Sequence, residues 1–242
     1  MRVSHSIKTP TGPLEYSITH RSRVTRRLHL ELDDQGGLVI VAPGHWSKAH
    51  ISATMAQNTT RIVRFLARAR QQQLGPLCYQ SGEQHLFLGD SYQLDTGQTS
   101  RNPVGVSISG NVIGVRTRQA TADSVKAALH CWYRDQALAV FDERLQIIAQ
   151  KASWAESRAI PLKLRRMKRT WGNCSSAGLI KLNTHLIKAP LRLIDSVIAH
   201  ELCHLVQMNH GKSFYALLES LNPDWRRDRA VLRTSGFIYL RE

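Results

Sequence analysis

The sequence has few of the features that would place a chain in a membrane or in the secretory pathway. It contains no run of about 18 apolar residues, so no membrane-spanning helix is implied. Its first residues, Met1–Ser6, lack the apolar core of a signal peptide. We therefore expect a cytoplasmic protein that is not exported and has no membrane partner.

Cysteine is scarce and scattered. The four cysteines show no C-x-x-C spacing, and in a cytosolic chain they are expected to be free thiols instead of a disulfide framework. Internal repeats and low-complexity tracts are also missing. With 242 residues, the chain is long enough for one large domain, or two small ones, with a substantial core. The cysteines are Cys78, Cys131, Cys174 and Cys203.

Acidic residues are few as well. Only 18 Asp and Glu stand against 33 Lys and Arg, which gives a net charge of +15. This excess permits binding to nucleotides, nucleic acids or other polyanions. No RNA- or DNA-binding motif accompanies the basic residues, so a generally basic, solvated surface is the alternative. Four clusters carry much of the charge: Arg21, Arg23, Arg26 and Arg27; Arg61, Arg64, Arg68 and Arg70; Arg165, Arg166, Lys168 and Arg169; and Arg226, Arg227, Arg229 and Arg233.

One motif in the chain specifies chemistry. His200 and His204 flank Glu201 in an H-E-x-x-H pattern, and His210 follows six residues later. On a helix, residues four apart lie on one face, so the first two imidazoles project toward one point. A third imidazole from the following chain would complete a three-nitrogen zinc site with an open fourth position. Glu201 is then placed to take a proton from a metal-bound water.

The residues around the motif support this interpretation over a surface helix with merely solvated histidines. Apolar residues recur at helical spacing from Ile194 to Leu205 and predict a helix with one buried stripe. We expect this helix to end near Met208, because Asn209 and Gly211 favour a turn. The turn would bring His210 back toward the metal. A second, short helix is predicted over 212–221.

Three segments near the histidines share the pattern of one protein family. In them the chain resembles the YgjP-like metallopeptidase family, a relative of SprT-like and WLM zinc proteins. This resemblance implies that His200, His204 and His210 bind one zinc ion per chain and that Glu201 is the catalytic base. It is strong over about residues 160–225 and looser around Arg23, Arg26 and Arg27. The segments are Arg169–Ser175, with Asn173 where the family usually has Ser; Gly178–Asn183; and Val197–His204 with Asn209, His210 and Phe214.

The chain as a whole predicts an α+β fold. We expect residues 1–120 to form a β-rich N-terminal part with one helix, unless residues 1–242 make one continuous domain. The family resemblance implies a zincin-like catalytic core over 121–242, in which a small mixed or antiparallel sheet packs on the active-site helix. The predicted elements are a hairpin with strands at 28–32 and 38–41, helices at 46–73 and 121–151, short strands within 84–116, and strands at 162–167 and 179–182.

Several residues are candidates for holding a substrate. The strand ending at Asn183 precedes the metal helix, and we expect it to be a sheet edge that pairs with an extended peptide through Leu179, Ile180 and Asn183. An ordinary core strand is the alternative. The amides of Asn173 and Asn183 and the hydroxyl of Tyr215 could stabilise an oxyanion. The guanidinium groups of Arg165 and Arg166 could hold phosphates.

Three functions are compatible with these residues. The first is a zinc peptidase acting on peptides or unfolded proteins, and the second is a metal-dependent phosphohydrolase acting on nucleotides. The third is a non-enzymatic module that binds nucleic acid or protein and holds a structural zinc. Glu201 argues against the third, since a structural site needs no base. Basic residues gathered beside the metal would favour phosphate chemistry over peptide hydrolysis.

Overall fold

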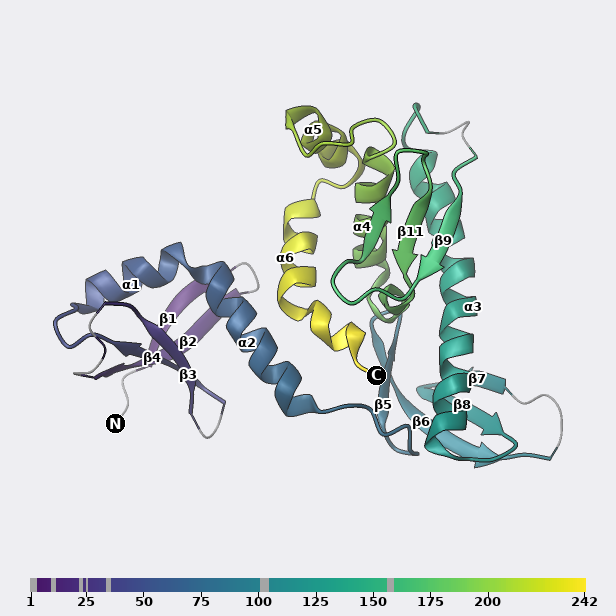
Figure 1. The fold of residues 1–242 in the computed structure, drawn as a ribbon, viewed down its shortest axis with the longest axis horizontal. Coiled ribbons are helices and arrows are strands. Elements are labelled where there is room, and N and C mark those ends of the chain that lie inside the picture. Colours follow the sequence, from purple (N-terminus) through teal and green to yellow (C-terminus); the bar gives the residue numbers. More distant parts are fainter. Residues whose placement is uncertain are drawn as a thin grey trace. The chain divides into compact units, whose positions relative to one another are not determined.

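The contacts of the chain divide it into two compact units, each built from helices and sheets (Figure 1). The computed structural model describes residues 4–9, 12–21, 24, 26–33, 36–100, 105–155 and 159–242. The first unit comprises residues 1–75 and 230–237, and the second comprises 76–229 and 238–242. The predicted α+β class is confirmed. The boundary predicted near residue 120 falls inside the second unit, between a strand and a long helix.

A mixed four-stranded sheet forms the centre of the first unit. Its order is β1-β2-β4-β3, with β2 and β4 parallel and the outer pairs antiparallel. The predicted hairpin is confirmed as β3 and β4, although Asp34 and Gln35 in its turn lie outside the described residues, as does Arg23. All five residues of β4 are buried. The strands are β1 (Ser4–Thr9), β2 (Gly12–His20), β3 (His29–Leu32) and β4 (Leu38–Ala42).

The single helix predicted over 46–73 is wrong, because the structure has two helices there. Helix α1 (Lys48–Gln57) ends at Asn58, and α2 (Thr59–Leu74) begins directly after it. The backbone N–H of Asn58 bonds to the carbonyl of Met55 at 3.0 Å, and its side-chain amide donates to the carbonyl of Thr54 at 2.8 Å. An Asn side chain that bonds to nearby backbone in this way competes with helix continuation.

Two sheets and a long helix frame the second unit. The strands predicted within 84–116 form a four-stranded sheet of order β5-β6-β8-β7. A second sheet has three strands in the order β10-β11-β9. The elements are β5 (Gln84–Phe87), β6 (Asp90–Gln98), β7 (Gly105–Ser109), β8 (Val112–Thr117), α3 (Ala122–Ala149), β9 (Leu162–Arg165), β10 (Gly172–Cys174), β11 (Ile180–Asn183) and the 3₁₀ helix η1 (Thr184–Lys188).

Helix α3 confirms the long helix predicted over 121–151 and packs against both sheets and the next helix, α4 (Leu191–Cys203). The hydroxyl of Thr121 caps its first turn. Buried residues recur along one stripe, with Phe141 fully enclosed. Arg144 makes two hydrogen bonds to Asp195 of α4, at 2.6 and 2.7 Å. This bidentate pair fixes α4 on its support.

The C-terminal part of the chain contacts α4 through Asp228, and residues 230–237 of this part belong to the first unit. Arg192 of α4 pairs with Asp228, whose carboxylate is fully buried and also accepts from the amide of Asn222 at 3.0 Å. Removal of Arg192 would leave the buried charge of Asp228 without a counterion, which is strongly destabilising. The remaining elements are α5 (Lys212–Leu221), α6 (Trp225–Ser235) and the 3₁₀ helix η2 (Gly236–Leu240). Among the described residues, every helix is too short or too polar to cross a bilayer.

Candidate metal centre

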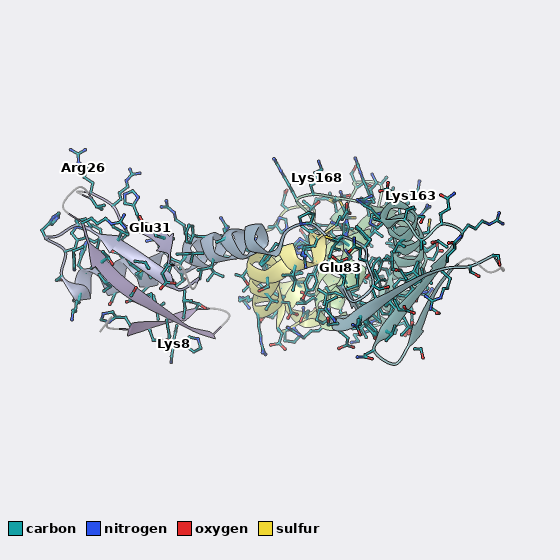
Figure 2. All side chains as sticks on the ribbon, turned by 90° about the horizontal axis from the view of Figure 1, so that it is seen from below. Lys8, Arg26, Glu31, Glu83, Lys163 and Lys168 are labelled. Atoms are coloured by element: carbon teal, nitrogen blue, oxygen red, sulfur yellow. The ribbon has the colours of Figure 1, made fainter. Side chains whose placement is uncertain are left out.

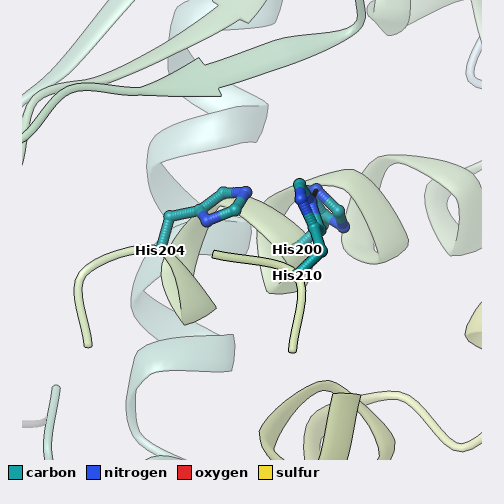
Figure 3. A group of neighbouring side chains, drawn as sticks. All are labelled: His200, His204 and His210. Atoms are coloured by element: carbon teal, nitrogen blue, oxygen red, sulfur yellow. Dashed lines mark hydrogen bonds between the residues drawn. The ribbon is translucent and has the colours of Figure 1, made fainter. Parts of the chain in front are cut away.

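The three predicted metal ligands come together at the C-terminal end of α4. One nitrogen from each of His200, His204 and His210 can be chosen so that all three lie within 4.8 Å of one another. Figure 3 shows the three rings turned toward a shared space. The Nε2 atoms of His200 and His210 are 3.1 Å apart. Two nitrogens on one tetrahedral zinc ion would be about 3.3 Å apart, so this pair has the spacing that such a metal requires.

The helix is shorter than predicted, but both histidines keep their common face. Helix α4 ends at Cys203 instead of near Met208, so that prediction is wrong. After Cys203 the backbone hydrogen bonds connect residues three positions apart, as in a 3₁₀ turn. The N–H of Leu205, for example, donates to the carbonyl of Leu202 at 2.9 Å. His204 retains helical backbone angles at the cap position. The ring centres of His200 and His204 therefore lie 5.0 Å apart, with the rings nearly perpendicular at 82°.

A buried aromatic ring supports all three imidazoles. Phe214 on α5 is fully buried, and its ring centre lies 5.0, 4.7 and 4.6 Å from those of His200, His204 and His210 respectively. Helix α5 begins at Lys212 as predicted, so the turn from 204 to 211 brings His210 back over the end of α4. The packing of Phe214 limits how far each ring can rotate.

Hydrogen bonding and electrostatics prepare the rings for a metal. The Nδ1–H of His204 donates to the carbonyl of Gln207 at 3.0 Å, which leaves Nε2 with its lone pair free. Burial, the other two histidines and Arg229 lower the pKa of His200 to about 4. Burial, His204 and Arg229 also lower the pKa of His210. Both rings are therefore neutral at pH 7, as metal ligands must be.

Glu201 lies beside the ligands in an enclosed position. Glu201 is only 5% exposed, and this burial raises the pKa of its carboxyl group from the usual 4.5 to about 7. A carboxyl group with a pKa near the working pH can both accept and return a proton. It abuts Gly172 of β10, where an added Cβ would come within 2.8 Å of both Cγ and Oε1 of Glu201. Glycine at position 172 therefore leaves room for the carboxylate where it now lies.

We expect Gly172→Ala to retain its metal and to lose about tenfold in turnover, because the new methyl group pushes the carboxylate away from its position. Metal content and turnover measured on the same sample test this. Gly105→Ala is the matched control, since a Cβ there meets nothing within 4 Å. Unchanged turnover in the Gly172 variant would show that the carboxylate has room to move.

The strand predicted to be a sheet edge lies instead in the middle of its sheet. β11 is hydrogen-bonded to β10 on one side and to β9 on the other, so the edge assignment of Leu179–Asn183 is wrong. Ile180 is fully buried, and Leu179 is partly buried. Asn183 has no exposed surface, and its amide donates to the carbonyls of Met167 and Thr170 at 2.8 and 3.0 Å. These two hydrogen bonds attach the segment that leads into β10 to Asn183.

The other predicted substrate residues are divided between the site and a distant cluster. Tyr215 lies near the metal ligands, with its ring 6.3 Å from His210 and stacked on Trp225 at 4.9 Å. Asn173 is exposed on β10, next to Gly172. Arg165 is exposed on β9, whereas Arg166 pairs with Glu242, the last residue of the chain. That carboxylate also pairs with His185.

Arg229 also acts on the metal ligands, and the sequence gives no sign of this. This exposed residue of α6 is near enough to lower the pKa of both His200 and His210. In the sequence it is one of four arginines in a basic cluster, and nothing local distinguishes it. Trp171, beside Gly172, packs edge-on against Tyr239 at 6.2 Å.

Comparisons with known proteins identify a family that the chain matches. The family described as a YgjP-like metallopeptidase domain matches residues 26–235. No curated protein matches the chain. Among solved structures, the metallopeptidase zymogen of Pyrococcus abyssi abylysin is similar, with a TM-score of 0.33 and 20% sequence identity. That match covers 37% of this chain and 87% of the other.

Proposed function

The chain belongs to the YgjP-like metallopeptidase family, and from this premise we propose that it is a zinc-dependent peptidase with Glu201 as its general base. One observation carries the proposal. The buried carboxyl group of Glu201, with its pKa near 7, lies beside three converging imidazoles, of which those of His200 and His210 are neutral. A structural zinc site has no use for such a base, because its ligands alone hold the fold.

The chemistry divides between the metal and the chain. A zinc ion held by His200, His204 and His210 would supply Lewis acidity toward a carbonyl oxygen and toward water. Glu201 takes a proton from the attacking water and later gives it to the leaving amine. Tyr215, whose ring centre lies 6.3 Å from that of His210, is the donor that we propose for the developing oxyanion. Asn173 follows Gly172 on β10 and presents its side chain to the other face of the strand, so it is the weaker candidate.

We propose that β10, not β11, pairs with an extended peptide. Among the described strands, β10 lies at the edge of its sheet and is hydrogen-bonded to β11. The carbonyl of Trp171 accepts from the N–H of Asn183 at 2.8 Å, and the N–H of Ser175 donates to the carbonyl of Leu179 at 3.0 Å. Because backbone groups alternate along an antiparallel pair, those of Gly172 and Cys174 face the free edge. A peptide bound there would lie beside Glu201, which contacts Gly172.

Exposed apolar residues next to the ligands favour a peptide. Val206 and Met208, in the turn between His204 and His210, are 44% and 50% exposed. Large apolar side chains at the surface are frequent where a protein binds an apolar partner. They would contact apolar side chains of an unfolded segment, a class of substrate that also presents an extended backbone to β10.

Phosphate-ester hydrolysis of a nucleotide is the second candidate function, and Arg229 is the observation that favours it. Its charge acts on His200 and His210, so an anionic substrate at these imidazoles would be attracted. Arg166, proposed for this role from the sequence, already pairs with Glu242. Arg229 is therefore the main candidate for binding phosphate. The exposed Arg165 is a weaker candidate.

A product screen separates the two functions. The full chain, loaded with zinc, is incubated with a pool of unfolded peptides and with nucleoside triphosphates, beside the Glu201→Gln variant. Mass spectrometry then identifies the products. Peptide fragments that require Glu201 support the peptidase and map its specificity. Phosphate or pyrophosphate that requires Glu201, without fragments, transfers the assignment to a phosphohydrolase. Products that form equally with the variant would contradict both.

A further inference from the structure

A pocket of about 600 Å³ lies in the first unit, away from the metal ligands in sequence and built only from residues 26–65. Small-molecule sites commonly occupy about 300–1,000 Å³. Met55 and Ile62 are buried members of the core beneath it, and Leu28 and Leu30 are partly buried beside them. This lining is apolar at the base and cationic where it meets solvent.

Two basic clusters that are distant in sequence meet at this pocket. Arg26 and Arg27 precede β3, and Arg61 and Arg64 lie on α2 at a spacing that places them on one face. All four are exposed, and none of the described residues that line the pocket is Asp or Glu. Figure 2 shows Arg26 reaching outward from the first unit.

These arginines are not neutralised by the protein itself. Within the part of the chain that the structure describes, none of the four pairs with a carboxylate, whereas the nearby Arg21 makes two bonds of 2.9 Å to Glu31. Residues 1–75 hold eleven Lys and Arg against four Asp and Glu, nearly half of the net +15 in under a third of the chain. Like charges gathered without counterions repel one another, and a bound anion would remove that cost.

Aromatic rings complete the lining. Trp46 and Phe65 are only partly buried, and both line the pocket while packing on the core. The ring of Trp46 is held in place edge-on by His50, at 4.3 Å between centres. Guanidinium groups bind phosphates, and exposed aromatic rings stack on nucleobases. A purely apolar ligand would use the rings but not the four charges.

We propose that this pocket binds a nucleotide, with its base on Trp46 or Phe65 and its phosphates on the surrounding arginines. The nucleotide is either one unit of a single-stranded nucleic acid or a free nucleoside triphosphate, since both present a base and several negative charges. The open, exposed arrangement of the arginines suits a strand whose successive phosphates pass over them. This inference concerns binding alone and does not depend on what the metal centre hydrolyses.

Fluorescence anisotropy of a labelled, mixed-sequence, ten-nucleotide single strand with the full chain tests the proposal. The double variant Arg61→Gln/Arg64→Gln should weaken binding at least about tenfold. Its plot of log affinity against log salt should also be shallower by about 1.4, the share of two phosphate contacts. The matched control is Lys8→Gln/Lys48→Gln, which removes the same charge from the same unit outside the pocket and should cost less than about twofold. Figure 2 places Lys8 and Arg26 on opposite sides of this unit.

Further measurements identify the ligand and guard against misfolding. Trp46→Leu keeps an apolar side chain on the core, and loss of stacking should weaken binding about tenfold at any salt concentration. Unlabelled ATP that displaces the strand at micromolar concentration would identify a free nucleotide as the ligand; displacement by unlabelled strand alone would identify nucleic acid. Thermal unfolding of each variant should match that of the wild type. Equal losses in the arginine and lysine pairs, or no binding of either probe, would overturn the proposal.

Discussion

Replacing Glu201 by Gln is expected to leave the metal bound and to reduce turnover at least about 100-fold. The amide keeps the size of the carboxyl group in the space beside Gly172, so the three imidazoles retain their positions. What is lost is the ability to accept a proton from water, a role worth about 10²–10⁴ in rate. Turnover on the substrate found by the product screen, with metal content measured on the same samples, tests this.

The control is Glu143→Gln, the same change on an exposed carboxylate of α3, which should leave turnover unchanged. Full activity in the Glu201 variant would show that another group is the base. Loss of metal from it would contradict the assignment of Glu201 as a residue outside the ligand set.

The same substitution has a consequence for stability that carries a definite sign. Burial raises the folded-state pKa of Glu201 from 4.5 to about 7, so the unfolded chain releases this proton more readily than the folded one. The contribution of Glu201 to the stability of the metal-free protein should therefore be lost as the pH rises from about 4.5 to above 7. Gln cannot ionise, so the metal-free variant should equal or exceed the wild type in thermal stability at pH 8.

The metal ligands could be predicted from sequence because their arrangement is local. Two histidines four residues apart share a helix face wherever that helix packs. His210 follows His204 by only six residues. Phe214 belongs to the apolar residues that recur at helical spacing in α5. Even the early end of α4 did not disturb this, since His204 keeps helical backbone angles.

The substrate side of the site could not be predicted in the same way, because strand order depends on contacts between distant segments. β11 was recognisable as a strand, but its two neighbours begin 18 and 8 residues earlier, at Leu162 and Gly172. β10 is only three residues long and contains a glycine, so it lacks the alternation of apolar and polar residues from which a strand can be predicted. The nearness of Arg229 to His200 likewise follows from how α6 returns to α4.

Asn183 shows how a polar residue predicted to bind substrate can belong to the interior instead. Its amide nitrogen donates to the carbonyls of Met167 and Thr170, and its oxygen accepts from the N–H of His185 at 3.1 Å and of Met167 at 3.4 Å. A residue that binds substrate would keep part of this capacity free. Here the whole amide holds the segment between β9 and β10 onto β11.

We therefore expect Asn183→Ala to lower the free energy of unfolding by about 3 kcal/mol, because four backbone groups lose a buried partner. Thermal unfolding should shift down by about 10 °C in a unit of this size. The exposed Asn111→Ala is the matched control and should stay within about 0.5 kcal/mol of the wild type. Asn183→Asp distinguishes hydrogen bonding from packing, since a carboxylate fills the same space but cannot donate to the two carbonyls. Its stability should fall further as the pH rises above the ordinary range of a carboxyl pKa. A variant with unchanged stability and a raised KM would instead restore Asn183 to the substrate site.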